Sequence, residues 1–274
     1  MNYIIKIRTE LNDLIDICRY FINRFFCRNS LQKKIEKEVE AGVNNLVDGN
    51  NGIVEIVEAV KKNGYIILPN VLSKETLDKI RSEFRTIIDL KSEEFYAVDR
   101  QQDTVCVRMK PFFKIKYSFA YPAIYAFYDS SVFRAITKLF YADCPNGFDY
   151  VSELFVHETP ETETPISGKL HWDRAQTLKY WIYLDDLPDE AGPMLIEPGS
   201  VEKNKNIRID AHKVKNELIG GIDNIVEEPI NELIPLSAGA GSIMIHDTDA
   251  SHGASRVMPG YVRRIIRGHC RARM

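Results

Sequence analysis

The chain has 274 residues, of which 45% are hydrophobic and 27% are charged. This length allows one large domain or two small ones, and the composition excludes a wholly disordered chain. The formal net charge of −3 gives no reason to expect binding to nucleic acid.

The cysteines and the apolar stretches indicate the compartment. The five cysteines are scattered and form no CxxC pair, which favours a reducing compartment over a disulfide framework or a cysteine zinc site: Cys18, Cys27, Cys106, Cys144 and Cys270. No run reaches the roughly 18 uninterrupted apolar residues that a membrane span needs. The N-terminus lacks the clean apolar stretch and the cleavage site of a signal peptide. We therefore expect a cytoplasmic protein.

Residues 1–50 are predicted to form an N-terminal helical extension. Over residues 3–27, apolar side chains recur at helical spacing with basic residues between them: Ile4, Ile7, Leu11, Leu14, Cys18, Phe21 and Phe25. We expect this helix to pack on the main domain or on a second subunit, which would make an oligomer. Contact of residues 1–28 with a membrane surface is the alternative, because aromatic and basic residues both occur there.

A polar stretch, Asp48–Gly52, is typical of a linker or turn. After it, the pattern predicts a short helix over Ile53–Lys62 and a strand over Tyr65–Pro69. Ser73 is a suitable N-cap for a further helix that ends at Leu90.

Residues 119–141 predict two more helices, broken near Asp129–Ser131. From about residue 148, short strand-like runs alternate with turns, as in an antiparallel sandwich or barrel: Tyr150–His157, Lys169–Asp173, Leu178–Leu184, Met194–Glu197, Gly241–His246 and Val262–Cys270. The charged segment 202–232 interrupts this series and is predicted to be a helical insertion over one face. Residues 51–274 are thus expected to form one α+β domain.

His171 and Asp173 are separated by one residue in a strand-like run. Side chains at i and i+2 of a strand point to the same side, so an imidazole and a carboxylate can reach one ion. With a distant second histidine they would form the two-histidine, one-carboxylate face of non-haem iron(II) enzymes, which leaves open coordination positions. A lone HxD pattern also occurs by chance, as an ordinary hydrogen-bonded pair.

The order of several further motifs resembles the phytanoyl-CoA dioxygenase family of iron(II)- and 2-oxoglutarate-dependent oxygenases, from about residue 53 onward. The motifs are the opening strand Gly64–Leu72, the HxD at His171–Asp173, the turn Pro198–Ser200, the histidine of His252–Ala254, and an arginine eleven residues after that histidine, Arg263.

This resemblance implies a double-stranded β-helix, a jelly-roll barrel, flanked by helices. It implies that His171, Asp173 and His252 hold Fe(II), and that Arg263 binds the distal carboxylate of 2-oxoglutarate through two parallel hydrogen bonds. The expected reaction uses O2 to hydroxylate a small-molecule substrate and releases succinate and CO2. Asp173 favours hydroxylation or a related oxidation over halogenation, because related halogenases carry a small residue at that position.

Some assignments have alternatives. His246 competes with His252 for the distal ligand position and has Arg256 downstream, but the glycine after His252 and the spacing to Arg263 match the family better. His157 stands where family members often carry a basic residue. It is predicted either to donate a hydrogen bond to 2-oxoglutarate or to be a structural histidine.

The substrate is less defined. Arg267 lies on the same predicted strand face as Arg263 and is a candidate contact to substrate or co-substrate. Three basic residues are candidates for an anion site, with a solvated loop as the alternative: Arg100, Arg108 and Lys110. Three aromatic residues are candidates for the lining of an apolar pocket, with a place in the core as the alternative: Tyr117, Tyr121 and Trp181. Rival functions are a catalytically silent binding module and a metal enzyme of the same fold that does not use 2-oxoglutarate.

Overall fold

The computed structural model describes residues 29–46, 51–90, 97–101, 104–161, 169–213 and 223–273. Residues 29–46 are helical. The helix expected over residues 3–27 lies outside the described residues, and so do its proposed contacts with a membrane or a second subunit. Within the described ranges, none of the helices has the length and apolar character to cross a membrane.

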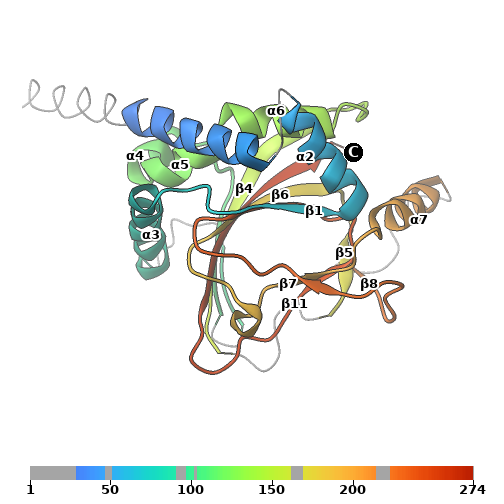
Figure 1. The fold of residues 1–274 in the computed structure, drawn as a ribbon. Helices are drawn as coiled ribbons and strands as arrows, with labels where there is room; N and C mark the ends of the chain where they lie inside the picture. The colour runs from blue at the N-terminus through green and yellow to red at the C-terminus, as the bar shows by residue number, and fades with distance from the viewer. Residues whose placement is uncertain are drawn as a thin grey trace, which may run out of the picture.

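Two antiparallel sheets form the centre of the fold (Figure 1). The larger sheet has the strand order β1-β10-β6-β12-β4-β3-β2, with the bounds β1 Tyr65–Leu68, β2 Ala97–Gln101, β3 Thr104–Met109, β4 Phe148–Thr159, β6 Thr177–Tyr183, β10 Ile243–Asp247 and β12 Arg263–Ala272. The smaller sheet has the order β8-β5-β11-β7-β9, with the bounds β5 His171–Asp173, β7 Met194–Ile196, β8 Asp223–Ile225, β9 Ile234–Pro235 and β11 His252–Ala254.

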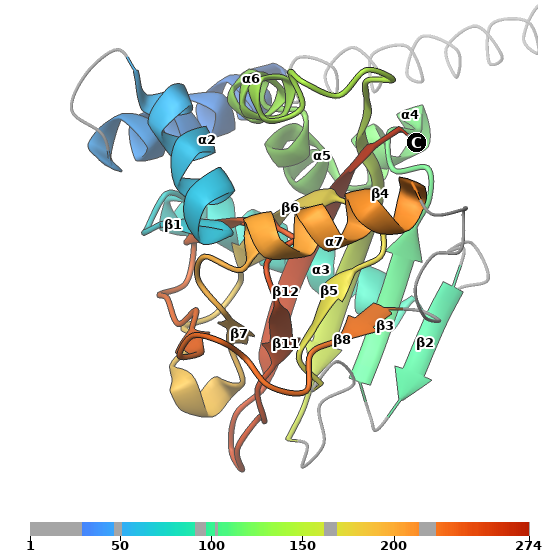
Figure 2. The same cartoon turned by 90° about the vertical axis from the view of Figure 1, so that its right-hand side faces the viewer.

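Helices cover the face of the larger sheet that points away from the smaller sheet (Figure 1). These helices are α2 Gly52–Asn63, α3 Lys74–Asp89, α4 Ile115–Ala120, α5 Pro122–Tyr128 and α6 Ser131–Phe140. A further helix, α7 Val201–Lys213, lies next to α2, as Figure 2 shows. The protein thus has a layer of helices, a large sheet and a small sheet.

Local sequence explains where several helices begin and end. Ser73 caps α3, since its hydroxyl accepts a hydrogen bond from the backbone N–H of Thr76. Ser130 caps α6 in the same way, through the N–H of Val132. Helix α2 ends at Gly64, whose φ of 89° is a left-handed conformation that glycine adopts without steric cost. The chain then turns directly into β1.

The period of two along β6 divides its side chains between two cores. Leu178, Tyr180 and Ile182 pack with the helices in the larger hydrophobic cluster. Trp181 and Tyr183 instead belong to a second cluster between the sheets, together with residues such as Met194 and Ile196 of β7. One strand therefore stabilises the helical layer with one face and lines the space between the sheets with the other.

The α+β class with antiparallel sheets is confirmed, and most expected elements lie within a few residues of their observed bounds. Two expectations were wrong. Segment 202–232 is not wholly helical, because Asp223–Ile225 forms β8 and pairs with β5. Gly52 is not part of a linker but the first residue of α2. Helix α4 and the β2–β3 hairpin were not predicted. The domain boundaries at residues 50 and 51 stay a prediction.

Candidate metal centre

Three potential metal ligands converge on two paired strands of the smaller sheet. His171 of β5 lies directly opposite His252 of β11 in the antiparallel register. Asp173 points to the same side as His171, as the HxD spacing predicts. The candidate ligand atoms of the three residues lie within 4.8 Å of one another, and Asp173 Oδ1 is 3.9 Å from His171 Nε2 and 3.6 Å from His252 Nε2. A single ion between these atoms could bind all three side chains.

Backbone carbonyls orient both histidine rings. His171 Nδ1 lies 2.8 Å from the carbonyl oxygen of Lys169, and His252 Nδ1 lies 2.8 Å from that of Ala250. A carbonyl can only accept a hydrogen bond, so each Nδ1 is the donor and each Nε2 faces Asp173. Burial lowers the pKa of His252 to about 3, against the opposing charge of Asp173. The ring is therefore neutral at pH 7, as a metal ligand must be.

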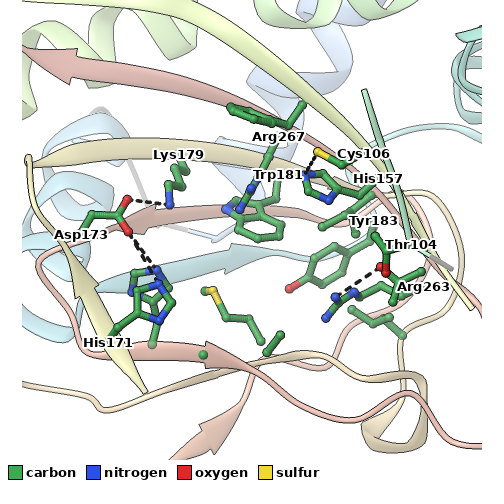
Figure 3. A pocket seen from close by; sticks show the side chains of 18 residues that line it. Thr104, Cys106, His157, His171, Asp173, Lys179, Trp181, Tyr183, Arg263 and Arg267 are labelled. Atoms are coloured by element: carbon green, nitrogen blue, oxygen red, sulfur yellow. Dashed lines mark hydrogen bonds and ion pairs between the residues drawn. The ribbon is translucent and has the colours of Figure 1, made fainter. Parts of the chain in front are cut away.

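Lys179 of β6 contacts and orients the third candidate ligand, Asp173. Its Nζ lies 2.8 Å from Asp173 Oδ2, which leaves Oδ1 facing the two histidines (Figure 3). Burial alone would raise the pKa of Asp173, but the charge and hydrogen bond of Lys179 and the charge of His252 hold it well below its ordinary value. Sequence reasoning missed Lys179. Its only signal was a charged residue inside an otherwise apolar strand, Leu178–Leu184.

The structure brings His252, and not His246, to His171 and Asp173. His246 is fully buried on β10, and its ring meets that of His252 edge-on, with 4.5 Å between the ring centroids. Neither ring nitrogen of His246 has a hydrogen-bond partner among the described residues. Arg256, the arginine expected to accompany His246, is not part of the cavity lining.

The three ligands open into a cavity of about 290 Å³ between the sheets. Figure 3 shows His171 and Asp173 at one end of it, Arg263 and Thr104 at the other, and Trp181 between them. The cavity wall includes apolar residues as well, among them Leu187, Met194 and Ile265. Small polar groups at two ends of a partly apolar cavity are typical of a site for a small molecule.

Arg263 is held in place but has no carboxylate partner in the part of the chain described. Its Nη1 donates to the carbonyl of Gly192 at 2.6 Å, and its Nη2 lies 3.5 Å from the hydroxyl of Thr159. Its Nε is buried without a partner. Burial, assisted by the charge of Arg267, lowers the pKa of Arg263 to about 10. The side chain is still a cation at pH 7, and it faces a cavity that could hold an anion.

The remaining candidates divide between the cavity and the core. His157 and Trp181 line the cavity, and His157 Nε2 lies 3.4 Å from the sulfur of Cys106. Burial, with the positive charge of Arg267, lowers the pKa of His157 well below its ordinary value, so its ring is neutral. Tyr117 and Tyr121 instead belong to the helix-facing core.

The expected basic loop with Arg108 is in fact strand β3. Arg108 donates to the fully buried carboxylate of Glu153 at 2.6 Å, so it is not available to bind an acidic ligand. Lys110 is exposed, and the side chain of Arg100 lies outside the described residues. Arg267 does line the cavity.

Comparisons with known proteins agree with this architecture. Residues 165–265 match the family model described as phytanoyl-CoA dioxygenase (PhyH). No curated protein matches the chain. Similar solved structures include the non-heme alpha ketoglutarate dependent epimerase SnoN from nogalamycin biosynthesis, with a TM-score of 0.54 and 15% identity over 80% of this chain and 81% of that one.

Two more have comparable scores. The carbocyclase SnoK from nogalamycin biosynthesis has a TM-score of 0.54 and 16% identity, with 79% of this chain and 83% of that chain covered. AviO1 from Streptomyces viridochromogenes Tue57 has a TM-score of 0.53 and 13% identity, with 81% and 96% covered. At these identities the likeness concerns the fold alone. The family match, by contrast, spans all three candidate metal ligands and Arg263, so residues 165–265 are similar to the phytanoyl-CoA dioxygenase family.

Proposed function

We propose that this protein is an oxygenase that depends on Fe(II) and 2-oxoglutarate and oxidises a small-molecule substrate with O2. One observation carries the proposal. A cluster of two imidazoles and one carboxylate shares a cavity with a buried arginine that has no acidic partner among the described residues. We also propose that the two sheets form a double-stranded β-helix and that residues 51–274 are the catalytic domain.

The donor set suits iron(II). His171 Nε2, His252 Nε2 and Asp173 Oδ1 would hold the metal, and three protein ligands leave coordination positions for a co-substrate and oxygen. Lys179 keeps the second carboxylate oxygen occupied, so Asp173 would hold the metal through its other oxygen. Bound iron(II), with 2-oxoglutarate and O2, supplies the oxidising power, and the products are oxidised substrate, succinate and CO2.

Arg263 would hold the distal carboxylate of 2-oxoglutarate. A guanidinium matches a carboxylate through two parallel hydrogen bonds, and a partner anion offsets the desolvation of this buried cation. His157 faces the same cavity, and its neutral ring can donate one hydrogen bond to the co-substrate. The apolar residues around them, such as Met194 and Leu187, exclude water.

Hydroxylation is the outcome we propose for the substrate. The chain carries a carboxylate at position 173, so no ligand position is free for a halide. The structural neighbours include an epimerase, a carbocyclase, and EctD from S. alaskensis with 2-oxoglutarate and 5-hydroxyectoine, which has a TM-score of 0.51. Product mass distinguishes these outcomes, because hydroxylation adds one oxygen atom, ring closure removes two hydrogens, and epimerisation leaves the mass unchanged.

The test is an assay of O2 consumption and succinate formation with a library of small molecules. We expect succinate only when Fe(II) and 2-oxoglutarate are both present, and we expect Asp173→Ala to abolish it. Asp143→Ala is the matched control, because the Asp143 side chain is 95% exposed and remote from the cavity. Oxygen consumption without 2-oxoglutarate would identify a different metal enzyme, and a folded protein that binds no iron would identify a silent binding module.

A further inference from the structure

A second arginine, Arg267, points into the cavity and has no role in the proposed chemistry. It lies two residues beyond Ile265 on β12, on the same face as Arg263, and it is part of the cavity lining. Figure 3 shows it beside Trp181, between the Lys179–Asp173 pair and Arg263. Arg267 is thus placed between the metal cluster and the arginine proposed to anchor 2-oxoglutarate.

Two aromatic rings hold the Arg267 guanidinium in place. Its Cζ lies 4.9 Å from the ring centroid of Phe155 and 5.4 Å from that of Trp181. These residues are its partners across the sheet, since Phe155 of β4 and Trp181 of β6 both lie opposite it in register. Stacking of this kind orients a guanidinium without using its N–H donors. The Nε of Arg267 is buried and has no hydrogen-bond partner among the described residues.

The neighbouring acids are already engaged by other cations. Asp173 pairs with Lys179 and faces the two histidines, as described above. Glu153, which is fully buried, pairs with Arg108 and with Arg271. Within the described ranges no carboxylate forms an ion pair with Arg267. Asp173 and Glu153 act on the charge of Arg267 from a distance, but neither contacts it directly, so a ligand that brings an anionic group to this half-buried cation would stabilise it.

The charge of the whole cavity supports the same conclusion. Its described lining carries three cations, Lys179, Arg263 and Arg267, and a single carboxylate, Asp173. Iron(II) brings two positive charges and 2-oxoglutarate brings two negative charges, so binding both leaves the positive excess of the wall unchanged. A neutral substrate would leave Arg267 uncompensated, whereas a substrate with an anionic group would neutralise it.

We propose that the substrate carries an anionic group, a carboxylate or a phosphate, and that Arg267 binds this group beside the metal centre. This proposal rests on the proposed oxygenase function, in which Arg263 binds the co-substrate and Arg267 binds the substrate. Phe155 and Trp181 act as positioning residues that aim the guanidinium. The anion and the metal would then fix two points of the substrate, which sets the carbon presented for oxidation.

The test uses benzoate and phenyl phosphate as anionic probes and benzyl alcohol as their neutral counterpart. Each is titrated calorimetrically and without oxygen into the full chain loaded with Fe(II) and 2-oxoglutarate. We expect the anions to bind more tightly than the alcohol. Arg267→Gln should weaken the anions by about 30-fold or more and leave the alcohol unchanged. Arg267→Lys, which keeps the charge, should restore part of the affinity.

Arg264→Gln is the matched control. Arg264 is the residue next to Arg263 on β12, but it pairs with Glu158 and Asp185 and does not line the cavity. This variant should bind all probes as the unaltered protein does. Equal binding of anions and alcohol by the unaltered protein would overturn the proposal. Unchanged anion affinity in Arg267→Gln would do the same, as would a collapse of 2-oxoglutarate affinity in that variant.

Failure of the oxygenase function would be visible separately, as absence of Fe(II) and 2-oxoglutarate binding. In that case the anion site is tested in Arg263→Gln protein without metal or co-substrate. Binding of benzoate that disappears when Arg267→Gln is added supports the anion site. Binding that persists in the double variant overturns it.

Discussion

The two faces of the larger sheet differ in how completely their polar groups are satisfied. On the helix side, the hydroxyl of Tyr128 donates to backbone oxygens of Tyr180 and Ile266, and that of Tyr141 donates to Cys270. On the cavity side, buried nitrogens without partners among the described residues occur on Trp181, Arg263, Arg267, His269 and His246. Natural proteins pair nearly all buried polar groups, so these exceptions need an explanation.

The difference indicates that one face has been shaped for stability and the other for ligands. Unsatisfied donors and cations reduce the stability of the folded chain, but they become useful once a metal and anions bind. Because strand residues alternate between faces, a single substitution in β6 or β12 can be chosen to change either the stability of the fold or the binding of ligands.

The largest effect is expected for the distal histidine. His252→Ala should abolish stoichiometric iron binding, since it removes one of the three ligands proposed among the described residues. His246→Phe should keep iron bound, because the ring at position 246 packs against His252 without joining the cluster. Iron per chain after anaerobic dialysis measures both. If His246→Phe lost iron and His252→Ala retained it, His246 and not His252 would be the metal ligand.

A substitution on the helix side should affect folding alone. Phe133 is fully buried in α6, and its ring centroid lies 4.7 Å from that of Tyr180. Phe133→Ala should reduce the free energy of unfolding by about 3–5 kcal/mol, through lost burial and the cavity that remains. Iron affinity of the folded fraction should not change.

Leu139→Ala is the control for Phe133→Ala, since Leu139 lies in the same helix but is 36% exposed. Leu139→Ala should reduce the free energy of unfolding by less than about 0.5 kcal/mol. Urea titrations followed by circular dichroism measure both variants. Equal destabilisation by the two substitutions would contradict the assignment of Phe133 to the core.

A buried acid on the helix side should give stability a pH dependence. Burial raises the pKa of Glu83 from 4.5 to about 7, although its carboxylate accepts hydrogen bonds from the backbone N–H groups of Ala123 and Ile124 at 2.8 Å. The pKa of Glu83 is higher in the folded chain than in the unfolded one, so protonated Glu83 stabilises the fold. This contribution to the free energy of unfolding is complete below pH 4.5 and is lost as the pH rises through 7. It amounts to about 3 kcal/mol.

Unfolding titrations at pH 5 and pH 8 detect this contribution, and Glu83→Gln is the comparison because glutamine does not titrate. The difference between the two pH values should be smaller in Glu83→Gln by the stated amount. An identical pH dependence in both proteins would show that the hydrogen bonds keep the Glu83 pKa near its ordinary value.

The smallest effect on folding is expected at Arg263. Arg263→Gln should raise the Kd for 2-oxoglutarate by about 30-fold or more, because the carboxylate loses a charged partner. Stability should stay equal or increase, since the variant removes a buried cation that has no acidic partner in the described ranges. Arg264→Gln should bind 2-oxoglutarate normally. A marked loss of stability in Arg263→Gln would show that the residue serves the fold.

Local patterns were sufficient to predict much of this architecture. The hydroxyl of Ser73, the glycine-bounded strands and the HxD spacing each act over a few residues, and the corresponding elements are observed. The approach of His252 to His171 was expected only through the resemblance to a family. Strand pairing between β5 and β11 brings the two together, and no local signal encodes that pairing.

Interactions between distant charges were not predictable in the same way. Lys179 reaches Asp173 because β6 of the larger sheet faces β5 of the smaller one, and Arg108 meets Glu153 because β3 pairs with β4. The paired strands β2 and β3 were missed because their charged residues resemble a loop. Strand β8 was missed because it lies within a segment whose composition favours a helix.

The central claim is that one cavity binds iron(II) and 2-oxoglutarate together, and an anaerobic titration tests it most directly. Iron(II) is added to the protein in the presence of 2-oxoglutarate while the weak visible charge-transfer band of the chelate is recorded. We predict a band that saturates at one iron per chain, is absent in Asp173→Ala, and requires more 2-oxoglutarate in Arg263→Gln. A folded, unaltered protein that gives no band at any concentration of either component would contradict the claim.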